Sequence, residues 1–508
     1  MNKKFYITTP IYYPSANFHI GHCYSTIIAD SIARYKRLDG FDTFFLTGSD
    51  EHGQKIEKKA QEAGVTPKEY VDKIVDNAKD LWKKLDISYD RFIRTTDEDH
   101  IKCVQKIFKK LYDKGDIYKG EYKGLYCTPC ESFWTETQLV DGKCPDCGRD
   151  VQLVKEEAYF LKLSNYQKQL EKFIEENPEF IQPESRKNEM LNNFIKPGLE
   201  DLCVSRTSFT WGIPVTFDPG HVVYVWIDAL SNYLTALGYG TEDSTLMDKY
   251  WPADVHIVGK EIVRFHTIIW PIMLMALNLP LPKKVFGHGW LIIDGGKISK
   301  SLGNYKDPRE YIEKYGKDAV RYYALREIPF GSDGNFSEEA LVSRINSDLA
   351  NVWGNLVNRT VGMANKYFNG IVENKHCTDE IDVALLSEID IIKTNVDKLI
   401  DKIQISKVLE TIFDLLRLCN KYIDDTTPWI LAKDESQKDR LETVLYNILE
   451  ALRVTNILLM PFMPESAQKV INILHTDSNN FNDTHYIGDE KFIVEKTPKP
   501  LFERIQSE

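Results

Sequence analysis

The sequence has few cysteines and no long apolar run. Nine cysteines among 508 residues are an odd number and a small fraction, which argues against a disulfide framework and predicts a reducing, cytoplasmic compartment. The most apolar stretch, 268–281, is short and contains Pro271 and Pro280, so it is typical of a core element rather than a membrane span. The first ten residues carry two lysines with no apolar run behind them, so we expect no signal peptide.

An excess of positive charge is also missing. Lys and Arg number 64 against 76 Asp and Glu, a formal net charge of -12. This excludes a protein that binds nucleic acid through its whole surface, but a local basic groove can still lie on an acidic body. Apolar residues make up 43% of the chain, and no repeat or low-complexity segment is visible. The length therefore predicts two to four folded domains.

The first fifty residues predict a strand, a helix and a second strand. The strands are expected over 4–9 and 41–46, with a helix from His22 that ends near Gly40. This unit is typical of an α/β fold with a doubly wound, parallel, Rossmann-like sheet. Ligands of such sheets bind at the carboxyl ends of the strands, where segments 19–22 and 48–52 fall.

The rest of the chain predicts an insertion, a return to the sheet and a helical end. A charged helix is expected over 167–176, and helical apolar faces recur after Ser301. Buried strands are expected over 222–226, 255–259 and 285–291. The helical faces cover 345–368, 384–403, 408–423 and 437–460. We expect the tail near Pro500 and Phe502 to pack back on the body.

Two histidines flank a glycine between the first predicted strand and helix, in His19-Ile20-Gly21-His22. Imidazoles beside a helix N-terminus can donate hydrogen bonds to phosphate oxygens, aided by the helix dipole. Gly21 has no side chain, so a flat base could lie against the backbone. Alone, the motif indicates adenylyl transfer in general or a chance pair of loop histidines.

Two lysines follow a glycine pair in the second half, in Asp294-Gly295-Gly296-Lys297-Ile298-Ser299-Lys300-Ser301. Lysines on a glycine-hinged loop can close over a triphosphate and offset charge on the α-phosphate and the leaving pyrophosphate. Alone, a solvated basic loop would be the better interpretation. Together with the histidine motif, phosphate binding is favoured.

Four cysteines have the spacing of a zinc knuckle: Cys127 and Cys130, then Cys144 and Cys147. Four thiolates close a tetrahedral site, so the predicted zinc is structural, one per chain, rather than catalytic. The alternative is four free cysteines. The remaining five are expected to be core or surface thiols: Cys23, Cys103, Cys203, Cys377 and Cys419.

The two motifs, their order and the knuckle between them resemble the class I aminoacyl-tRNA synthetases, and within that class the bacterial methionyl family with one four-cysteine knuckle. The resemblance covers nearly the whole chain and includes segments 10–13, 47–53, 225–230, 259–262, 421–424 and 428–429. Ile298 stands where the family usually has methionine, a change of similar volume.

The resemblance implies a cytoplasmic methionine–tRNA ligase that uses ATP with Mg²⁺, L-methionine and tRNA(Met), including the initiator tRNA. The chain ends just past the helical segments, without the C-terminal domain that dimerises many relatives, so we expect a monomer. The implied domains are 1–117 and 221–290 for the two catalytic halves, 118–220 for the insertion with the knuckle, 291–344 for the lysine loop and stem-contact region, 345–475 for the anticodon-binding bundle, and 476–508 for the tail.

The resemblance also implies roles for single residues at the ATP site. His19, His22, Lys297 and Lys300 would stabilise charge on the phosphates. Gly21, Gly259 and Glu261 would complete the site, with Glu261 accepting from the ribose hydroxyls. No role follows for His52.

For methionine, the resemblance implies that Asp50 binds the ammonium and that Arg206 lies beside Asp50 and orients it. Tyr13 and His266 would donate weakly to the sulfur. The side-chain pocket would be lined by Ile11, Tyr13, Trp226, Ala229, Leu230, Tyr233, Ile262, His266 and Trp270.

For the anticodon, the resemblance implies contacts with Asn355, Arg359, Pro428 and Trp429. Asn355 and Arg359 are one helical turn apart, and Trp429 could stack an unpaired base. For Trp429 alone, an anchor in the core at a helix end is an equally good interpretation.

Three alternatives stay open at this point. The isoleucine, valine and leucine synthetases carry an editing insertion larger than the roughly 100 residues available here, and the cysteine enzyme has an active-site zinc. A catalytically silent tRNA-binding paralogue would not need both motifs intact. A generic adenylyltransferase would not need the helical region after residue 345.

Overall fold

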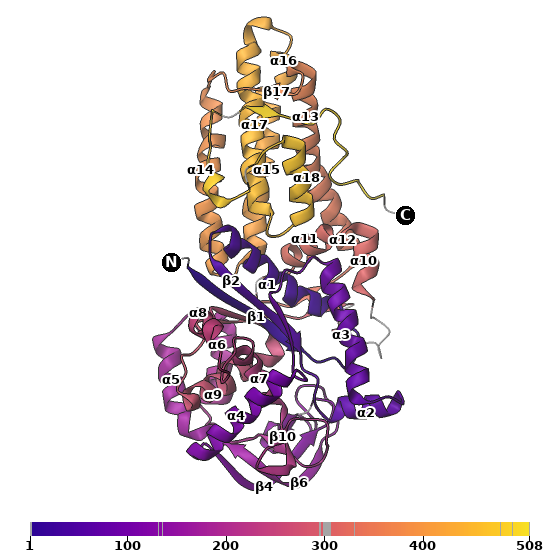
Figure 1. The fold of residues 1–508 in the computed structure, drawn as a ribbon. Coiled ribbons are helices and arrows are strands. Elements are labelled where there is room, and N and C mark those ends of the chain that lie inside the picture. Colours follow the sequence, from indigo (N-terminus) through magenta and orange to yellow (C-terminus); the bar gives the residue numbers. More distant parts are fainter. Residues whose placement is uncertain are drawn as a thin grey trace.

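The computed structural model describes residues 3–130, 132–134, 136–293, 296–297, 306–329, 331–477, 479–489 and 491–506. Figure 1 shows an elongated molecule, with an α/β body at one end and a bundle of long helices at the other. Among the described residues, no helix combines the length and apolarity needed to cross a bilayer.

The body is built on a parallel six-stranded sheet in the order β3-β2-β1-β12-β13-β7. The strands are β1 (Lys4–Tyr12), β2 (Asp42–Ser49), β3 (Arg91–Arg94), β7 (Ile181–Gln182), β12 (Val255–Gly259) and β13 (Val285–His288). The chain runs outward from β1 to β3, adds the short strand β7 at the opposite edge, and then runs outward again from β12 to β13 on the other side of β1. The order therefore reverses between β1 and β12, and in doubly wound sheets a ligand crevice is expected at the carboxyl ends of the two strands where it reverses. The predicted doubly wound α/β fold is confirmed.

Both faces of this sheet are covered, and β1 shows why. Its residues are buried in alternation on opposite sides: Phe5 and Ile7 belong to one core, and Tyr6 to the other, as successive strand side chains point to opposite faces. The first core includes α1 (Ile20–Leu38) and α3 (Pro67–Lys84), and the second includes α4 (Glu98–Lys114), α7 (Val225–Thr235) and α9 (Trp270–Leu277). The short helices α2 (Gln54–Glu62) and α8 (Thr245–Tyr250) complete the body.

The expected strand over 222–226 is wrong. Asp218–Val223 is a strand, β11, but it pairs antiparallel with β9 (Ser205–Arg206) and β10 (Pro214–Val215) outside the main sheet. The helix α7 begins at Val225. A short run of apolar residues has no periodicity that separates a strand from a buried helix, so the sequence pattern could not place this boundary. The strand expected over 255–259 is β12, and the one over 285–291 is divided into β13 and β14 (Leu291–Ile293).

The cysteine-rich region forms a four-stranded antiparallel sheet, β5-β4-β6-β8. Its strands are β4 (Ile117–Cys127), β5 (Ser132–Trp134), β6 (Gln152–Leu161) and β8 (Leu202–Cys203). The helix over 167–176 is present as α5, followed by α6 (Glu184–Met190). One strand of the predicted insertion, β7, joins the main sheet instead, so the insertion is not wholly separate from the catalytic body.

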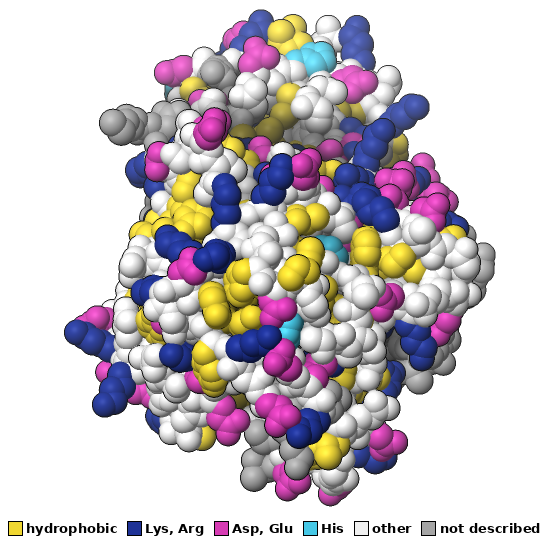
Figure 2. All heavy atoms as spheres, turned by 60° about the horizontal axis from the view of Figure 1, so that its bottom comes forward, with side chains coloured by type: hydrophobic (Ala, Val, Ile, Leu, Met, Phe, Trp, Pro, Cys, Tyr) yellow, Lys and Arg dark blue, Asp and Glu magenta, His cyan; other side chains and the backbone are white. Residues whose placement is uncertain are grey.

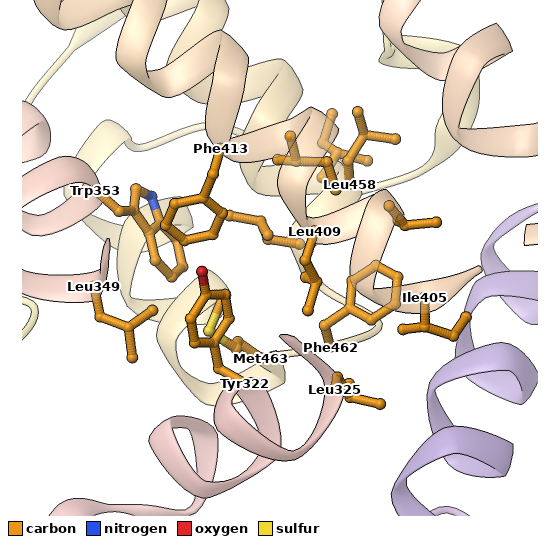
Figure 3. Close-up of a cluster of buried hydrophobic side chains, with 14 of the residues drawn as sticks. Tyr322, Leu325, Leu349, Trp353, Ile405, Leu409, Phe413, Leu458, Phe462 and Met463 are labelled. Carbon is orange, nitrogen blue, oxygen red and sulfur yellow. The ribbon is translucent and has the colours of Figure 1, made fainter. Parts of the chain in front are cut away.

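The helical end contains α13 (Asn355–Phe368), α14 (Glu380–Asp401), α15 (Ile405–Thr426), α16 (Pro428–Leu431), α17 (Lys438–Leu459) and α18 (Pro464–Leu474). A connecting region with α10 (Pro308–Tyr315), α11 (Lys317–Glu327) and α12 (Glu338–Arg344) links it to the body. Figure 3 shows Tyr322 and Leu325 of α11 facing Phe413 of α15 and Phe462, within one continuous core. Phe502 of the tail packs its ring 5.8 Å from that of Trp353.

The helix α1 contacts both halves of the molecule. Asp30 forms a fully buried ion pair with Arg321 of α11 at 2.7 Å. Arg321 also donates to the carbonyls of Pro461 and Phe462, which precede α18. Five residues beyond Asp30, Tyr35 donates to Asp397 of α14 at 2.6 Å. The body and the bundle are therefore joined by buried polar contacts as well as by the shared core.

Candidate active site

His19 and His22 lie at the N-terminus of α1, directly after the carboxyl end of β1. His19 is the N-cap: the backbone N–H of Gly21 donates to His19 Nδ1 at 3.1 Å, and the backbone N–H of His19 donates to His22 Nδ1 at 3.0 Å. Because each Nδ1 is an acceptor, the proton of each neutral ring lies on Nε2. Both imidazoles therefore present an Nε2–H donor beside the positive end of the helix dipole.

Gly21 has a steric reason to be glycine besides the one predicted. A Cβ at this position would lie 2.9 Å from His19 Cε1. A side chain at residue 21 would therefore displace the His19 ring from its capping position.

Two of the other predicted ATP residues, Gly259 and Glu261, lie at the carboxyl end of β12, next to β1. Gly259 ends β12, the neighbour of β1, and Glu261 follows it in a short helical turn. Trp290 donates its indole N–H to Glu261 Oε2 at 2.5 Å, which orients the carboxylate. Lys300 lies outside the described residues, and Lys297 is described only as backbone in β15 (Gly296–Lys297). The roles of both lysines stay predictions.

A buried aromatic cluster lies beside the crevice, and its polar atoms pair with one another. His266 Nδ1 donates to the carbonyl of Ile262 at 2.9 Å, and Tyr233 donates to His266 Nε2 at 2.7 Å. Burial lowers the pKa of His266 to about 4, so the ring is neutral and Nε2 is an acceptor. Both ring nitrogens are thus engaged. The predicted weak donation from His266 to a methionine sulfur is therefore wrong for this arrangement.

The same cluster contains further predicted pocket residues. Leu230, Tyr233 and Trp270 are almost fully buried, whereas Ile11, Trp226 and Ile262 pack against them and keep partial exposure. The Trp226 ring stacks on Phe265 with 3.3 Å between centroids, and Trp270 donates to His256 Nε2 at 3.2 Å. Ala229 is buried on α7, and Tyr13 is partly exposed after β1. The wall that remains for a ligand is mainly apolar and aromatic.

Asp50 and Arg206 are both buried, with different described contacts. The backbone N–H of Asp50 donates to the carbonyl of Tyr12 at 3.0 Å, which places Asp50 at the carboxyl ends of β1 and β2. Arg206 forms an ion pair with Glu156 and donates to Ser208 at 2.9 Å. Its guanidinium lies 4.3 Å from the Tyr126 ring centroid. The orientation of Asp50 by Arg206 stays a prediction.

His52, for which no role was predicted, binds a buried carboxylate. Asp228 of α7 contacts His52 Nδ1 at 2.7 Å through Oδ2 and His100 Nε2 of α4 at 2.8 Å through Oδ1. Burial raises the pKa of Asp228, but the two histidines outweigh it and lower the pKa overall. This network ties the loop of Asp50 to the pocket helix α7. The sequence did contain a signal for this network: Asp228 is a charged residue within the mainly apolar helix α7. A buried carboxylate requires polar or charged partners, so such partners could have been expected.

The four knuckle cysteines come together as predicted. Cys127 Sγ lies 3.5 Å from Cys147 Sγ, and Cys144 Sγ lies 3.9 Å from Cys130 Sγ; all four sulfurs lie within 4.8 Å of one another. Tetrahedral zinc with bonds of about 2.3 Å places its thiolates about 3.8 Å apart. The donor set and its geometry therefore fit a zinc ion.

Comparison with known proteins shows which family the chain belongs to. The family model for tRNA synthetases class I (M) matches residues 5–154 and 149–361, and the model for the anticodon-binding domain of tRNA ligase matches residues 382–507. The methionine–tRNA ligase of Clostridium acetobutylicum is 63% identical over 92% of this chain and 73% of its own length. The chain belongs to the methionine–tRNA ligase family. The Bacillus subtilis ligase is 54% identical, over 100% of this chain and 79% of its own length.

Solved structures of this family have the same fold. Mycobacterium tuberculosis methionyl-tRNA synthetase in complex with methionyl-adenylate superposes with a TM-score of 0.95 at 42% identity, covering 98% of this chain and 99% of that chain. The apo form of the same synthetase has a TM-score of 0.88 at 40% identity and covers 100% and 99% of the two chains. The arrangement described here is thus nearer to the adenylate complex.

The structure places the four residues that were predicted to face the anticodon in or next to the helical end. Asn355 is exposed at the start of α13, and Arg359 one turn later donates to Asp424 of α15 at 3.2 Å. Trp429 of α16 is 41% exposed, whereas Pro428 is buried. The exposure of Trp429 favours a role in contacting a ligand over a role as an anchor in the core. The buried Pro428 has the position expected of a residue that packs in the core.

Proposed function

We propose that this methionine–tRNA ligase activates L-methionine at the crevice between β1 and β12 and transfers it to tRNA(Met). The observation that carries the proposal is the pair of capping histidines, whose Nε2–H groups are fixed as donors at a helix N-terminus. Such donors stabilise charge that develops on phosphate oxygens. Catalysis of this kind needs positioning and electrostatic complementarity more than acid–base chemistry.

In the activation step, the methionine carboxylate attacks the α-phosphorus of ATP in line, and pyrophosphate leaves. His19 and His22 donate to phosphate oxygens, and Lys297 and Lys300, which follow β14 in the sequence, offset the charge on the leaving group. Gly259 and Glu261 hold the nucleoside, with Glu261 accepting from the ribose. Mg²⁺ accompanies ATP as part of the substrate.

Methionine selection rests on the aromatic cluster. The polar tips of Tyr233, His266 and Trp270 bind other protein groups, so they offer the ligand ring faces and edges. Thioether sulfur makes favourable contacts with aromatic edges, which suits methionine better than a charged or strongly polar side chain. Asp50 binds the ammonium group at the end of the crevice.

In the transfer step, the 2′-hydroxyl of the terminal adenosine of tRNA takes the methionyl group, and AMP leaves. The anticodon, of initiator and elongator tRNA alike, lies against Asn355, Arg359 and Trp429 at the far end of the bundle. Figure 2 shows basic and acidic side chains of the described residues interspersed over one face of the molecule. The zinc ion, when bound, is structural and holds the knuckle together. We propose a cytoplasmic monomer.

The test is amino-acid-dependent ATP–pyrophosphate exchange with methionine, isoleucine, leucine, valine and cysteine. Exchange with methionine alone supports both the activation chemistry and the pocket. Exchange with another amino acid would support the activation mechanism but contradict the assignment of the pocket to methionine. No exchange with any of them, from folded and zinc-loaded protein, supports a silent tRNA-binding protein instead.

A further inference from the structure

Arg264 lies between the zinc knuckle and the aromatic cluster of the pocket. It directly precedes the π-helix η5 (Phe265–Ile269), which supplies Phe265 and His266. The guanidinium carbon lies 5.2 Å from the ring centroid of Trp134, 5.1 Å from that of Phe194 and 4.8 Å from that of Phe265. Three rings from three separate segments therefore surround one cation, at distances typical of cation–π contacts.

On the knuckle side, Arg264 contacts a side chain that depends on the zinc ligands. Trp134 is 5% exposed and packs in a small cluster with Cys127 and Cys144. Asp146, in the turn between Cys144 and Cys147, supplies opposite charge: burial lowers the pKa of Arg264, and the Asp146 carboxylate raises it. Small metal-binding clusters generally need their metal to remain ordered, so we expect metal loading to fix the positions of Trp134 and Asp146.

On the pocket side, Arg264 contacts the wall that faces the ligand. Phe265 stacks on Trp226 at an interplanar angle of 10°, and Trp226 is one of the partly exposed members of the cluster. The next residue, His266, is the acceptor for Tyr233. A shift of Arg264 would therefore move Phe265, and with it the Trp226 ring.

We propose that Arg264 is a positioning residue through which the metal-loaded knuckle sets the Phe265–Trp226 wall of the methionine pocket. The inference rests on the proposed function, because it assigns that wall to methionine. The inference predicts different behaviour for the two substrates: methionine binding depends on the knuckle, whereas ATP binding does not. ATP binding is independent because His19 and His22 are held by their own helix cap.

The test measures equilibrium binding of L-methionine and of ATP to the full chain, together with zinc content. Arg264→Met keeps an unbranched apolar stem and removes the cation. We expect it to retain about one zinc per chain, to weaken methionine binding about tenfold and to leave ATP binding within twofold. Arg149→Met is the matched control, because Arg149 is exposed on the same knuckle; it should change neither affinity. Arg264→Lys should restore only part of the loss, because an ammonium does not stack as a planar guanidinium does.

Metal removal completes the test. In the wild-type chain, a chelator that strips the zinc should weaken methionine binding by a similar factor. In Arg264→Met, removal of the zinc should weaken methionine binding by less than a further twofold, because the variant already lacks the contact between the knuckle and the pocket wall. The inference would be overturned if the variant and zinc removal weakened methionine binding independently, so that their two factors multiplied. Normal methionine binding by Arg264→Met would overturn it as well.

Two further results keep the outcomes distinct. If Arg264→Met does not fold, Trp134→Leu removes the knuckle side of the link and should weaken methionine binding alone; unchanged binding would reject the inference. If the wild-type chain does not bind methionine at all, the proposed function fails, and the inference fails with it. If the wild-type chain binds methionine and all variants match it, only the inference fails.

Discussion

The hydroxyl of Tyr233 donates to Nε2 of His266 across 2.7 Å, and this bond fixes what the pocket can offer a ligand. Since His266 Nδ1 is engaged by the Ile262 carbonyl, the Tyr233–His266 pair satisfies itself and contributes no strong donor to the wall. An apolar, polarizable side chain is the ligand that loses least hydrogen bonding on entering such a site.

Removal of the Tyr233 hydroxyl should lower the stability of the protein and weaken its use of methionine. Tyr233→Phe leaves His266 Nε2 buried without its donor, so we expect the free energy of unfolding to fall by about 1–3 kcal/mol. Exchange assays should show a raised KM for methionine and an unchanged KM for ATP. Tyr367→Phe, on the partly exposed face of α13, serves as the control; an equal loss there would show that the hydroxyl of Tyr233 is not special.

The low pKa of His266 predicts a pH dependence of stability with a definite sign. Burial lowers this pKa from 6.5 to about 4, so between these values the unfolded chain binds the extra proton and the folded chain does not. Stability should therefore fall as the pH drops from 6.5 to 4, by about 1.4 kcal/mol per pH unit for this group. Denaturant titrations across that range measure the slope, and His266→Asn should reduce it. A slope that is the same in both proteins would show that His266 is not buried in its neutral form.

Asp228 should be needed for folding and for methionine use. Asp228→Asn removes the charge that pairs with His52 and His100, so we expect destabilisation of about 3 kcal/mol. Activation should show a higher KM for methionine, because α7 and the loop of Asp50 lose their link. Asp76→Asn, at an exposed position of α3, should be neutral in both assays. Full stability of Asp228→Asn would contradict the buried network.

The knuckle should hold about one zinc per chain. Cys130→Ser removes one of the four ligands and should abolish stoichiometric zinc in metal analysis of purified protein. Cys377→Ser changes an exposed cysteine outside the cluster and should retain the full complement. Zinc retained by Cys130→Ser at wild-type affinity would mean that the metal is bound elsewhere.

Trp429 should matter for tRNA and not for the fold. Because its side chain is 41% exposed, Trp429→Ala should change the free energy of unfolding by less than about 0.5 kcal/mol. Loss of one stacking contact should weaken tRNA use by about 1–3 kcal/mol, with pyrophosphate exchange intact. A variant that loses stability and exchange together would assign Trp429 to packing.

Patterns in the sequence predicted those parts of the molecule that depend on local periodicity. The strand–helix–strand unit, the cysteine knuckle and the amphipathic faces of the bundle all appear where the residue spacing placed them. The strand over 222–226 failed because a short apolar run fits a strand or a helix, and β7, two residues long, has no pattern of its own. Helix α5 was predicted as a charged helix over the same ten residues, and in the structure it buries Leu170 and Ile174, which lie one turn apart.

The site was predictable only in part. Single residues could be named by resemblance, but the contacts among them depend on pairs distant in sequence. Asp228 meets His52 and His100 across 176 and 128 positions. The inability of His266 to donate follows from its second hydrogen bond, which no sequence pattern contains. Arg264 has no motif at all; only its three surrounding rings single it out.

The buried pair of Asp30 and Arg321 has a consequence for how the molecule unfolds. Arg321 is shared among α1, its own helix and the carbonyls that precede α18, and the apolar core is continuous across the same junction. Separating the body from the bundle would leave the Arg321 cation with fewer partners, and at the same time it would expose the shared apolar core. The catalytic body and the helical bundle should therefore unfold in a single cooperative transition rather than as two independent domains.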